Sequence, residues 1–215
     1  MRPFFESVFC RWFPFSGFTL AVAILFFASA VPPVFPQSNA VTLPRNLSQL
    51  VSEADSIVQG RVTSVSLEPH PQLRNLLMVV VTVQLEDTLL GQSTGIYTFH
   101  QAVIDKRDQR QEMGYRVGQH LLLAMMRPSV YGLTSPAGMQ QGRFEIVPGA
   151  DGKLYAVNSF GNLGLFRGMD SQLKGLRAQV SQKTVEQFDG QKSGPLRLED
   201  LKTVIRSVAP RKLPQ

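Results

Sequence analysis

The sequence predicts a mainly β protein, a small OB-like β-barrel of about five or six strands with a short N-terminal helix and a C-terminal amphipathic helix. Three observations support this prediction. Segments with strand composition follow one another between residues 57 and 157, no helical periodicity interrupts them, and loops containing Gly or Pro separate them. Closure removes exposed strand edges, and about 110 residues suffice for such a barrel. We therefore assign residues 45–158 to a β-barrel domain.

The strands are assigned from residue composition and alternation. The clearest one runs from Leu76 to Asp87 and is rich in valine, whose β-branched side chain suits a pleated surface. Residues 117–126 are apolar on both faces from Leu121 onward, which predicts a central strand covered on both sides. The other predicted strands are residues 57–67, 96–104, 139–147 and 153–157.

Two helices are expected to flank the strands. Residues 45–54 form the first, with Asn46 as its N-cap, and residues 195–209 form the second. Apolar residues recur at helical spacing on one face of each: Leu47, Leu50, Val51 and Ala54 in the first, and Leu198, Leu201, Val204, Ile205 and Val208 in the second. Residues 159–194, between the barrel and the second helix, are rich in Gly, Ser, Gln and Lys, which predicts a flexible linker.

A glycine, Gly60, lies inside the first predicted strand. Val58 and Val62 share one face of that strand, whereas Val65 has the opposite parity. A strand that keeps the same face buried across such a change contains one extra residue, so we expect a β-bulge near Arg61–Ser64. Gly60 just before it would permit the bend that closes a small barrel.

The N-terminus predicts export. Arg2 and Arg11 precede a charge-free apolar run over residues 13–31, and Ala28-Ser29-Ala30 has the small-x-small form that signal peptidase requires. We expect a signal peptide over residues 1–30 and a Pro-rich linker over residues 31–44. The run of about 19 apolar residues also has the length of a bilayer span, so an uncleaved membrane anchor is the alternative. In both cases the rest of the chain is expected outside the cytoplasm, either periplasmic or secreted.

Charge and cysteine content exclude several classes of protein. The 215 residues carry a formal net charge of +6, a modest basic excess that is typical of a solvated surface rather than a nucleic-acid interface. The only cysteine, Cys10, lies in the leader, so a mature, cysteine-free chain has neither disulfides nor a cysteine nucleophile. Such a protein depends on its own core, as bacterial envelope proteins commonly do.

Four segments occur in a recognisable order: ADSIVQGRVTSV at 54–65, QLEDTLLGQ at 84–92, YRVGQHLLLAMM at 115–126 and MQQGRFEIV at 139–147. This order resembles a set of poorly characterised exported bacterial proteins with an OB-like barrel, over residues 52–157. It is also distantly similar to the netrin-like module of tissue inhibitors of metalloproteinases, an OB-type barrel. Netrin-like modules depend on disulfides, so no inhibitory role is carried over. The resemblance implies a fold and a compartment but no activity.

No residues have the spacing of a catalytic, cofactor or metal site. His70, His100 and His120 are not at ligand spacing, and the alternative is a zinc site assembled across the strands that hold the last two. GQSTG at 91–95 has the letters of a nucleophile elbow but lies between two strands, where a hairpin loop is expected. We therefore predict no catalytic residue, no metal ligand and no cofactor.

The long loops supply the candidate contact residues. Tyr115, Arg116, Tyr131 and Met139 lie in or beside these loops, and Tyr, Arg and Met are residue types favoured at interfaces. These four residues are the predicted surface-contact site.

The expected function is that of an exported, non-enzymatic binding or structural module of the bacterial envelope. Its predicted partner is a protein or an envelope polymer, not nucleic acid, and it meets the membrane only through an uncleaved N-terminal segment. One alternative is a hydrolase whose site assembles in space, with His100 or His120 beside a carboxylate. The other is a membrane-anchored periplasmic domain.

Overall fold

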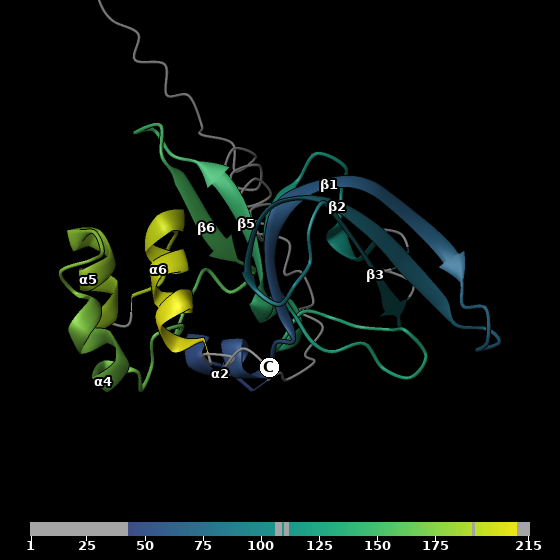
Figure 1. The fold of residues 1–215 in the computed structure, drawn as a ribbon, viewed down its shortest axis with the longest axis horizontal. Helices are drawn as coiled ribbons and strands as arrows, with labels where there is room; N and C mark the ends of the chain where they lie inside the picture. Colours follow the sequence, from purple (N-terminus) through teal and green to yellow (C-terminus); the bar gives the residue numbers. More distant parts are fainter. Residues whose placement is uncertain (1–42, 106–108, 110–111, 191, 210–215) are drawn as a thin grey trace, which may run out of the picture. The chain divides into compact units, whose positions relative to one another are not determined.

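The computed structural model describes residues 43–105, 109, 112–190 and 192–209 (Figure 1). The expected signal peptide or anchor, and the linker up to residue 42, lie outside these residues. The described strands are β1 (Ser56–Pro69), β2 (Leu77–Leu90), β3 (Ile96–Val103), β4 (His120–Met125), β5 (Arg143–Pro148), β6 (Leu154–Asn158) and β7 (Leu196–Arg197). The helices are α2 (Leu47–Glu53), α4 (Asp170–Leu173), α5 (Gln182–Gly190) and α6 (Leu198–Val208), with 3-10 turns η1 (Glu112–Gly114), η2 (Met139–Gly142) and η3 (Lys174–Leu176).

The strands form one antiparallel sheet in the order β3-β2-β1-β4-β5-β6-β7. The prediction of a mainly β protein is confirmed. The sheet is not closed, so the structure does not confirm a small barrel of five or six strands. A loop over residues 127–138 nevertheless connects the outer strands of the β3-β2-β1-β4 half. It hydrogen-bonds to β3 from Thr134 N to His100 O (2.8 Å), and its Ser135 O accepts from Met126 N (3.0 Å) at the end of β4. Residue patterns identify strands, but they do not specify which strand edges pair.

Apolar side chains fill both faces of this sheet. One core lies between the sheet and the helices α2 and α6, and the other lies inside the curve of β1, β2 and β3. Strand β4 contributes to both, because Leu122 and Ala124 face the first core while Leu121, Leu123 and Met125 face the second. The prediction of a central strand covered on both sides is therefore confirmed.

The flanking helices follow their predicted patterns. Asn46 caps α2 in a capping box, in which its side chain accepts from Gln49 N and the Gln49 side chain accepts from Asn46 N, each at 2.9 Å. The apolar stripe of α6 is buried at Leu198, Leu201 and Ile205. Helix α6 thus packs on the sheet and α2, where its apolar face is removed from water.

Residues 159–194 differ from the flexible linker that the sequence predicted. They contain α4, η3 and α5, and the Phe166 and Phe188 rings pack edge to face with centroids 4.6 Å apart. The buried Asp200 of α6 accepts a hydrogen bond from Thr184 Oγ1 of α5 at 2.7 Å. Each helix here is too short to show a period in the sequence, so its order depends on packing against α6 and the sheet.

The predicted β-bulge near Arg61–Ser64 is present. The pairing of β1 with β2 shifts between Val62 and Ser64, so Thr63 is the extra residue on β1. Val58 and Val62 lie in the second core, and Val65 packs against the same core after the shift. The register also shifts between Gln59 and Gly60, where β2 carries the extra residue, Glu86. The long β1–β2 hairpin is accordingly curved (Figure 1).

Gly60 is required by close backbone approach at this second shift. A Cβ at Gly60 would lie 2.2 Å from the backbone oxygen of Gln84 and 2.8 Å from a methyl carbon of Val83. The backbone oxygen belongs to the paired strand and cannot move without breaking the ladder. The absence of a side chain at Gly60 therefore allows β1 and β2 to approach each other closely.

We expect Gly60→Ala to lower the free energy of unfolding by about 3 kcal/mol, because the added methyl group forces β1 and β2 apart. Urea denaturation monitored by circular dichroism measures the change. The matched control is Gly175→Ala, where an added Cβ meets nothing within 4 Å; we expect its effect to stay within about 0.5 kcal/mol. Equal stability of Gly60→Ala and the wild type would contradict the assigned contact.

Candidate functional site

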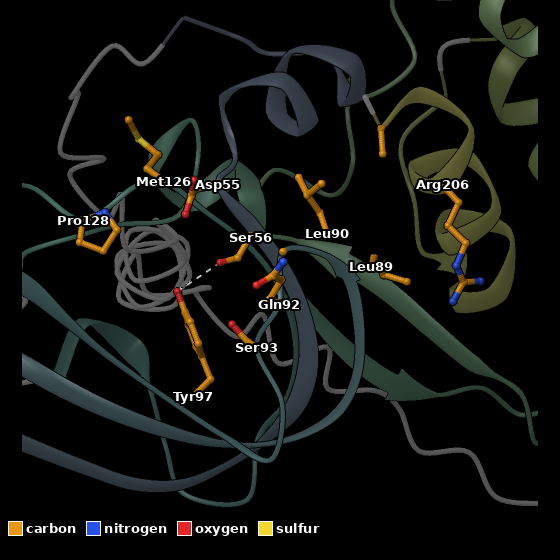
Figure 2. A pocket seen from close by; sticks show the side chains of 12 residues that line it. Asp55, Ser56, Leu89, Leu90, Gln92, Ser93, Tyr97, Met126, Pro128 and Arg206 are labelled. Atoms are coloured by element: carbon orange, nitrogen blue, oxygen red, sulfur yellow. Dashed lines mark hydrogen bonds between the residues drawn. The ribbon is translucent and has the colours of Figure 1, made fainter. Parts of the chain in front are cut away.

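The candidate site is a cleft of about 790 Å³ where the α2–β1 junction, the β2–β3 hairpin, the end of β4 and the end of α6 meet (Figure 2). Polar and apolar side chains both line it. The lining residues are Asp55, Ser56, Leu89, Leu90, Gly91, Gln92, Ser93, Tyr97, Met126, Pro128, Arg206 and Ala209.

Backbone pairing fixes the walls of this cleft. Asp55 N donates to Met125 O at 2.8 Å, which brings the start of β1 to the end of β4. The hairpin loop over residues 91–95 forms another wall, and it connects two strands as its sequence predicted. Gly91 has φ +93° in this loop, a conformation that favours glycine, and it lies close to Ser56.

Hydroxyl groups meet at the centre of the cleft. Ser56 Oγ and Tyr97 OH lie 3.3 Å apart and point toward each other (Figure 2). Burial raises the pKa of the Tyr97 phenol above its usual value; the hydrogen bond with Ser56 opposes this rise and the nearby Asp55 adds to it. Tyr97 therefore presents a neutral hydroxyl that both donates and accepts hydrogen bonds.

The charged groups that line the cleft are already paired. Asp55 Oδ1 lies 3.4 Å from a guanidinium nitrogen of Arg127, and Arg206 lies 3.1 Å from Asp87 Oδ2. Asp87 also pairs with Lys202 at 3.0 Å. The open hydrogen-bonding capacity of the cleft is thus that of hydroxyl and amide groups. None of the described residues that line the cleft is a histidine, and the Asp55 carboxylate beside Ser56 is already paired with Arg127.

Asp87 ties α6 to β2. Burial alone would raise the pKa of Asp87, but the hydrogen bond and charge of Lys202, together with the charge of Arg206, outweigh it and lower that pKa. The carboxylate is therefore ionised at neutral pH and holds two cations of α6 against the sheet. This contact fixes Arg206 at the rim of the cleft.

A second polar cluster lies across β1, β2 and β4. His120 Nε2 is 2.7 Å from Glu86 Oε2, and Gln59 Nε2 is 2.8 Å from the same oxygen. Arg61 Nε lies 3.2 Å from the other carboxylate oxygen, Glu86 Oε1. Burial lowers the pKa of His120 below its usual value, an effect that Glu86 opposes and Arg61 reinforces. This cluster combines a histidine and a carboxylate from residues far apart in the sequence, and none of its members lines the cleft.

The structure corrects one of the predicted contact residues. Tyr115 is 0% exposed and lies in the second core, so it is not available to a partner. Its hydroxyl donates to Gln101 Oε1 at 3.1 Å, and the guanidinium carbon of Arg143 lies 3.9 Å from its ring centroid. Its place in a polar loop suggested exposure, but the curve of the sheet encloses the ring.

The other three predicted contact residues are exposed but lie in separate loops. Arg116 precedes β4, Tyr131 lies in the loop over residues 127–138, and Met139 begins η2. No hydrogen bond or ring contact joins these three described residues. Tyr131 instead meets His70, whose Nε2 lies 3.1 Å from Tyr131 O. For Arg116, Tyr131 and Met139 the surface-contact site stays a prediction.

The histidines have distinct environments. His70 Nδ1 accepts from the backbone of Gln72 and Leu73 at 3.1 and 3.0 Å, which closes the β1–β2 turn. His100 lies on β3 and His120 on β4, with β2 and β1 between these strands in the sheet, so the structure does not assemble the alternative cross-strand zinc site. Among the described residues, no group of three His, Cys, Asp or Glu side chains is placed to hold a metal ion.

The chain was compared with protein families, with curated proteins and with solved structures. No protein-family profile, curated protein or solved structure matches the chain. Within the part of the chain that the structure describes, no helix has both the length and the apolar character needed to cross a bilayer.

Sequence reasoning missed the cleft for two reasons. Tyr97 alternates with Phe99 on β3, a pattern typical of core residues, and Ser56 gives no signal of its own. Gln92 and Ser93 occur in GQSTG, which indicated only a hairpin loop. The signal available was the position of that loop, next to the polar junction before β1, but pairing in space was needed to use it.

The raised pKa of the buried Tyr115 hydroxyl predicts a loss of stability at alkaline pH. Burial raises its pKa from 10.0 to about 12, with the charge of Arg143 opposing the rise. The unfolded chain therefore releases this proton before the folded chain does, and stability present below pH 10 is lost as the pH rises toward 12. We expect this group to contribute about 2 to 3 kcal/mol to that loss.

Urea denaturation of the wild type and Tyr115→Phe between pH 8 and pH 12 measures this contribution. We expect a shallower alkaline loss in Tyr115→Phe and the wild-type profile in the exposed control Tyr131→Phe. Identical profiles for the wild type and Tyr115→Phe would show that the Tyr115 proton does not stabilise the fold.

Proposed function

We propose that the protein is an exported, non-enzymatic binding module of the bacterial envelope, and that its cleft holds an uncharged, hydroxyl-rich segment of an envelope polymer. The observation that carries this proposal is the pairing of charges around the cleft. Asp55 is paired with Arg127 and Arg206 with Asp87, while among the described residues the hydroxyls of Ser56 and Tyr97 have only each other as partners. A ligand that donates and accepts hydrogen bonds without net charge matches such a lining.

Size and apolar content support the same ligand class. The volume of about 790 Å³ falls within the roughly 300–1,000 Å³ typical of small-ligand sites. Leu89, Met126 and Pro128 supply apolar contact beside the polar groups. A glycan segment combines an apolar ring face with a rim of hydroxyls, so it complements both parts of the lining.

The compartment and the finer fold assignment are part of the proposal. The apolar leader with its small-x-small site and the absence of cysteine after Cys10 support export. The loop over residues 127–138 bonds to both β3 and β4, which supports a partial OB-like barrel in the β3-β2-β1-β4 half. A membrane-anchored form is the alternative if the leader is not cleaved.

One observation favours the hydrolase alternative. His120 and Glu86 form a histidine–carboxylate pair at 2.7 Å, as a general base and its orienting group do. The second polar neighbour of His120, however, is the Gln59 amide at 2.9 Å, which is not a nucleophile. The pair also lies outside the cleft, so the binding function is better supported.

The test is a titration of the protein without its leader against neutral oligosaccharides from envelope polymers, measured by isothermal titration calorimetry. We expect Tyr97→Phe and Gln92→Ala to weaken binding about 3- to 10-fold each, the effect of one lost hydrogen bond. The matched control is Tyr155→Phe, which removes the hydroxyl of a tyrosine on β6 whose partner is Asp151. We expect this control to bind as the wild type does.

Two outcomes would contradict the proposal. One is the absence of binding to any neutral oligosaccharide at millimolar concentration. The other is binding that Tyr97→Phe and Gln92→Ala leave unchanged, because the ligand would then lie elsewhere. Turnover of an oligosaccharide that His120→Gln abolishes would instead support the hydrolase alternative.

A further inference from the structure

Three side-chain polar atoms meet in a triangle on one face of β1, β2 and β4. Its sides are Gln59 Nε2 to Glu86 Oε2 at 2.8 Å, His120 Nε2 to Glu86 Oε2 at 2.7 Å, and Gln59 Nε2 to His120 Nε2 at 2.9 Å. From this triangle we propose that Gln59, Glu86 and His120 bind a divalent transition-metal ion.

No placement of hydrogen atoms makes all three contacts of the triangle into hydrogen bonds. If His120 Nε2 carries a proton and donates it to Glu86, then His120 and Gln59 present N–H groups to each other at 2.9 Å. If His120 Nε2 accepts from Gln59, its lone pair faces the Glu86 carboxylate at 2.7 Å. One nitrogen cannot do both, so at least one close contact is repulsive without a further cation.

The Gln59 amide can present its oxygen to the triangle instead. Amide oxygen and nitrogen have nearly the same shape, and the hydrogen-bond network decides between the two orientations. Gln59 is 4% exposed, and as placed its Oε1 has no hydrogen-bond partner among the described residues. The contacts of Nε2 with Glu86 and His120 set this orientation, and Oε1 adds no hydrogen bond to it. A metal ion bound to the amide oxygen would replace the Nε2 contacts. Turned over, the amide joins the carboxylate oxygen and the imidazole nitrogen as a third electron-pair donor.

The size of the triangle fits one face of an octahedral site. Ligand atoms at right angles, each about 2.1 Å from an ion, are about 3 Å apart. The observed sides of 2.7 to 2.9 Å are close to this value. One nitrogen and two oxygen donors suit Mn²⁺, Fe²⁺, Co²⁺, Ni²⁺ or Zn²⁺. Glu86 is 38% exposed, so water can reach the remaining coordination positions.

The surrounding residues orient the ligands and limit the affinity. Arg61 holds Glu86 Oε1 at 3.2 Å and leaves Oε2 facing the triangle, as an outer-shell partner of a metal carboxylate does. Glu86 is the extra residue of the β2 bulge, which aims its side chain toward His120. The positive charges of Arg61 and the nearby Lys202 repel a metal ion, so we expect micromolar rather than nanomolar affinity.

The test uses untagged protein without its leader and the metal ion alone. Loss of the free Mn²⁺ signal in electron paramagnetic resonance measures the stoichiometry, and thermal unfolding with Mn²⁺ or Zn²⁺ measures stabilisation. We expect one ion per chain and a rise of about 5 °C or more in the unfolding temperature at a hundredfold excess over Kd. Neither readout depends on an envelope ligand, so this test is independent of the proposed cleft.

Matched variants locate the site. We expect His120→Gln and Glu86→Gln each to weaken binding at least 30-fold, whereas His100→Gln and Glu199→Gln bind as the wild type does. If His120→Gln does not fold, Glu86→Gln decides, because its side chain is partly exposed. The proposal is overturned if the wild type binds no ion at millimolar concentration, or if the Glu86 variant binds with unchanged affinity.

Discussion

Strand β1 is shared by two neighbours, and the rest of the sheet depends on that sharing. Over Ile57–Arg61 it pairs with β4 on one side and with β2 on the other, and beyond Arg61 its pairing continues with β2. A strand buried on both sides and both faces needs its polar groups paired and its side chains fitted. Gly60 meets this constraint, because the backbone of β2 occupies the space of its missing Cβ. The bulges that follow let one strand serve a double-sided core and then a curved hairpin.

The same irregularities position both sites. The register shift beside Gly60 makes Glu86 the extra residue of β2, which brings its carboxylate to His120, while the adjacent Asp87 holds α6 through Lys202. Farther along β2, the hairpin turn at Gly91 closes the cleft against the start of β1. The candidate metal site and the candidate polymer site therefore both depend on one short stretch of β2. They are held by the fold rather than by contiguous motifs.

A sequence prediction was correct where the feature depends on neighbouring residues and failed where it depends on contacts between distant residues. The α2 helix and its Asn46 cap, the doubly covered β4 and the β1 bulge follow from local alternation, period and capping, and each was predicted correctly. The prediction that Tyr115 is a surface contact was wrong, because strands distant in the sequence curve around its ring. Helices α4 and α5 form within the predicted linker because they pack against α6, which no local period indicates. The cleft and the Glu86–His120 pair unite residues that the sequence separates, so spacing rules could not find them.

The sequence by itself determined the class of secondary structure, the order of the elements, and the burial of the strand faces. These properties arise from side-chain period and from backbone preference, which act over a few residues. Only the tertiary structure decided that the sheet stays open, which strand edges pair, and which polar side chains converge. Edge pairing and polar convergence depend on contacts between residues such as Gln59 and His120, whose separation along the chain leaves no trace in any local pattern. The functional surfaces of this protein are consequences of pairing in space.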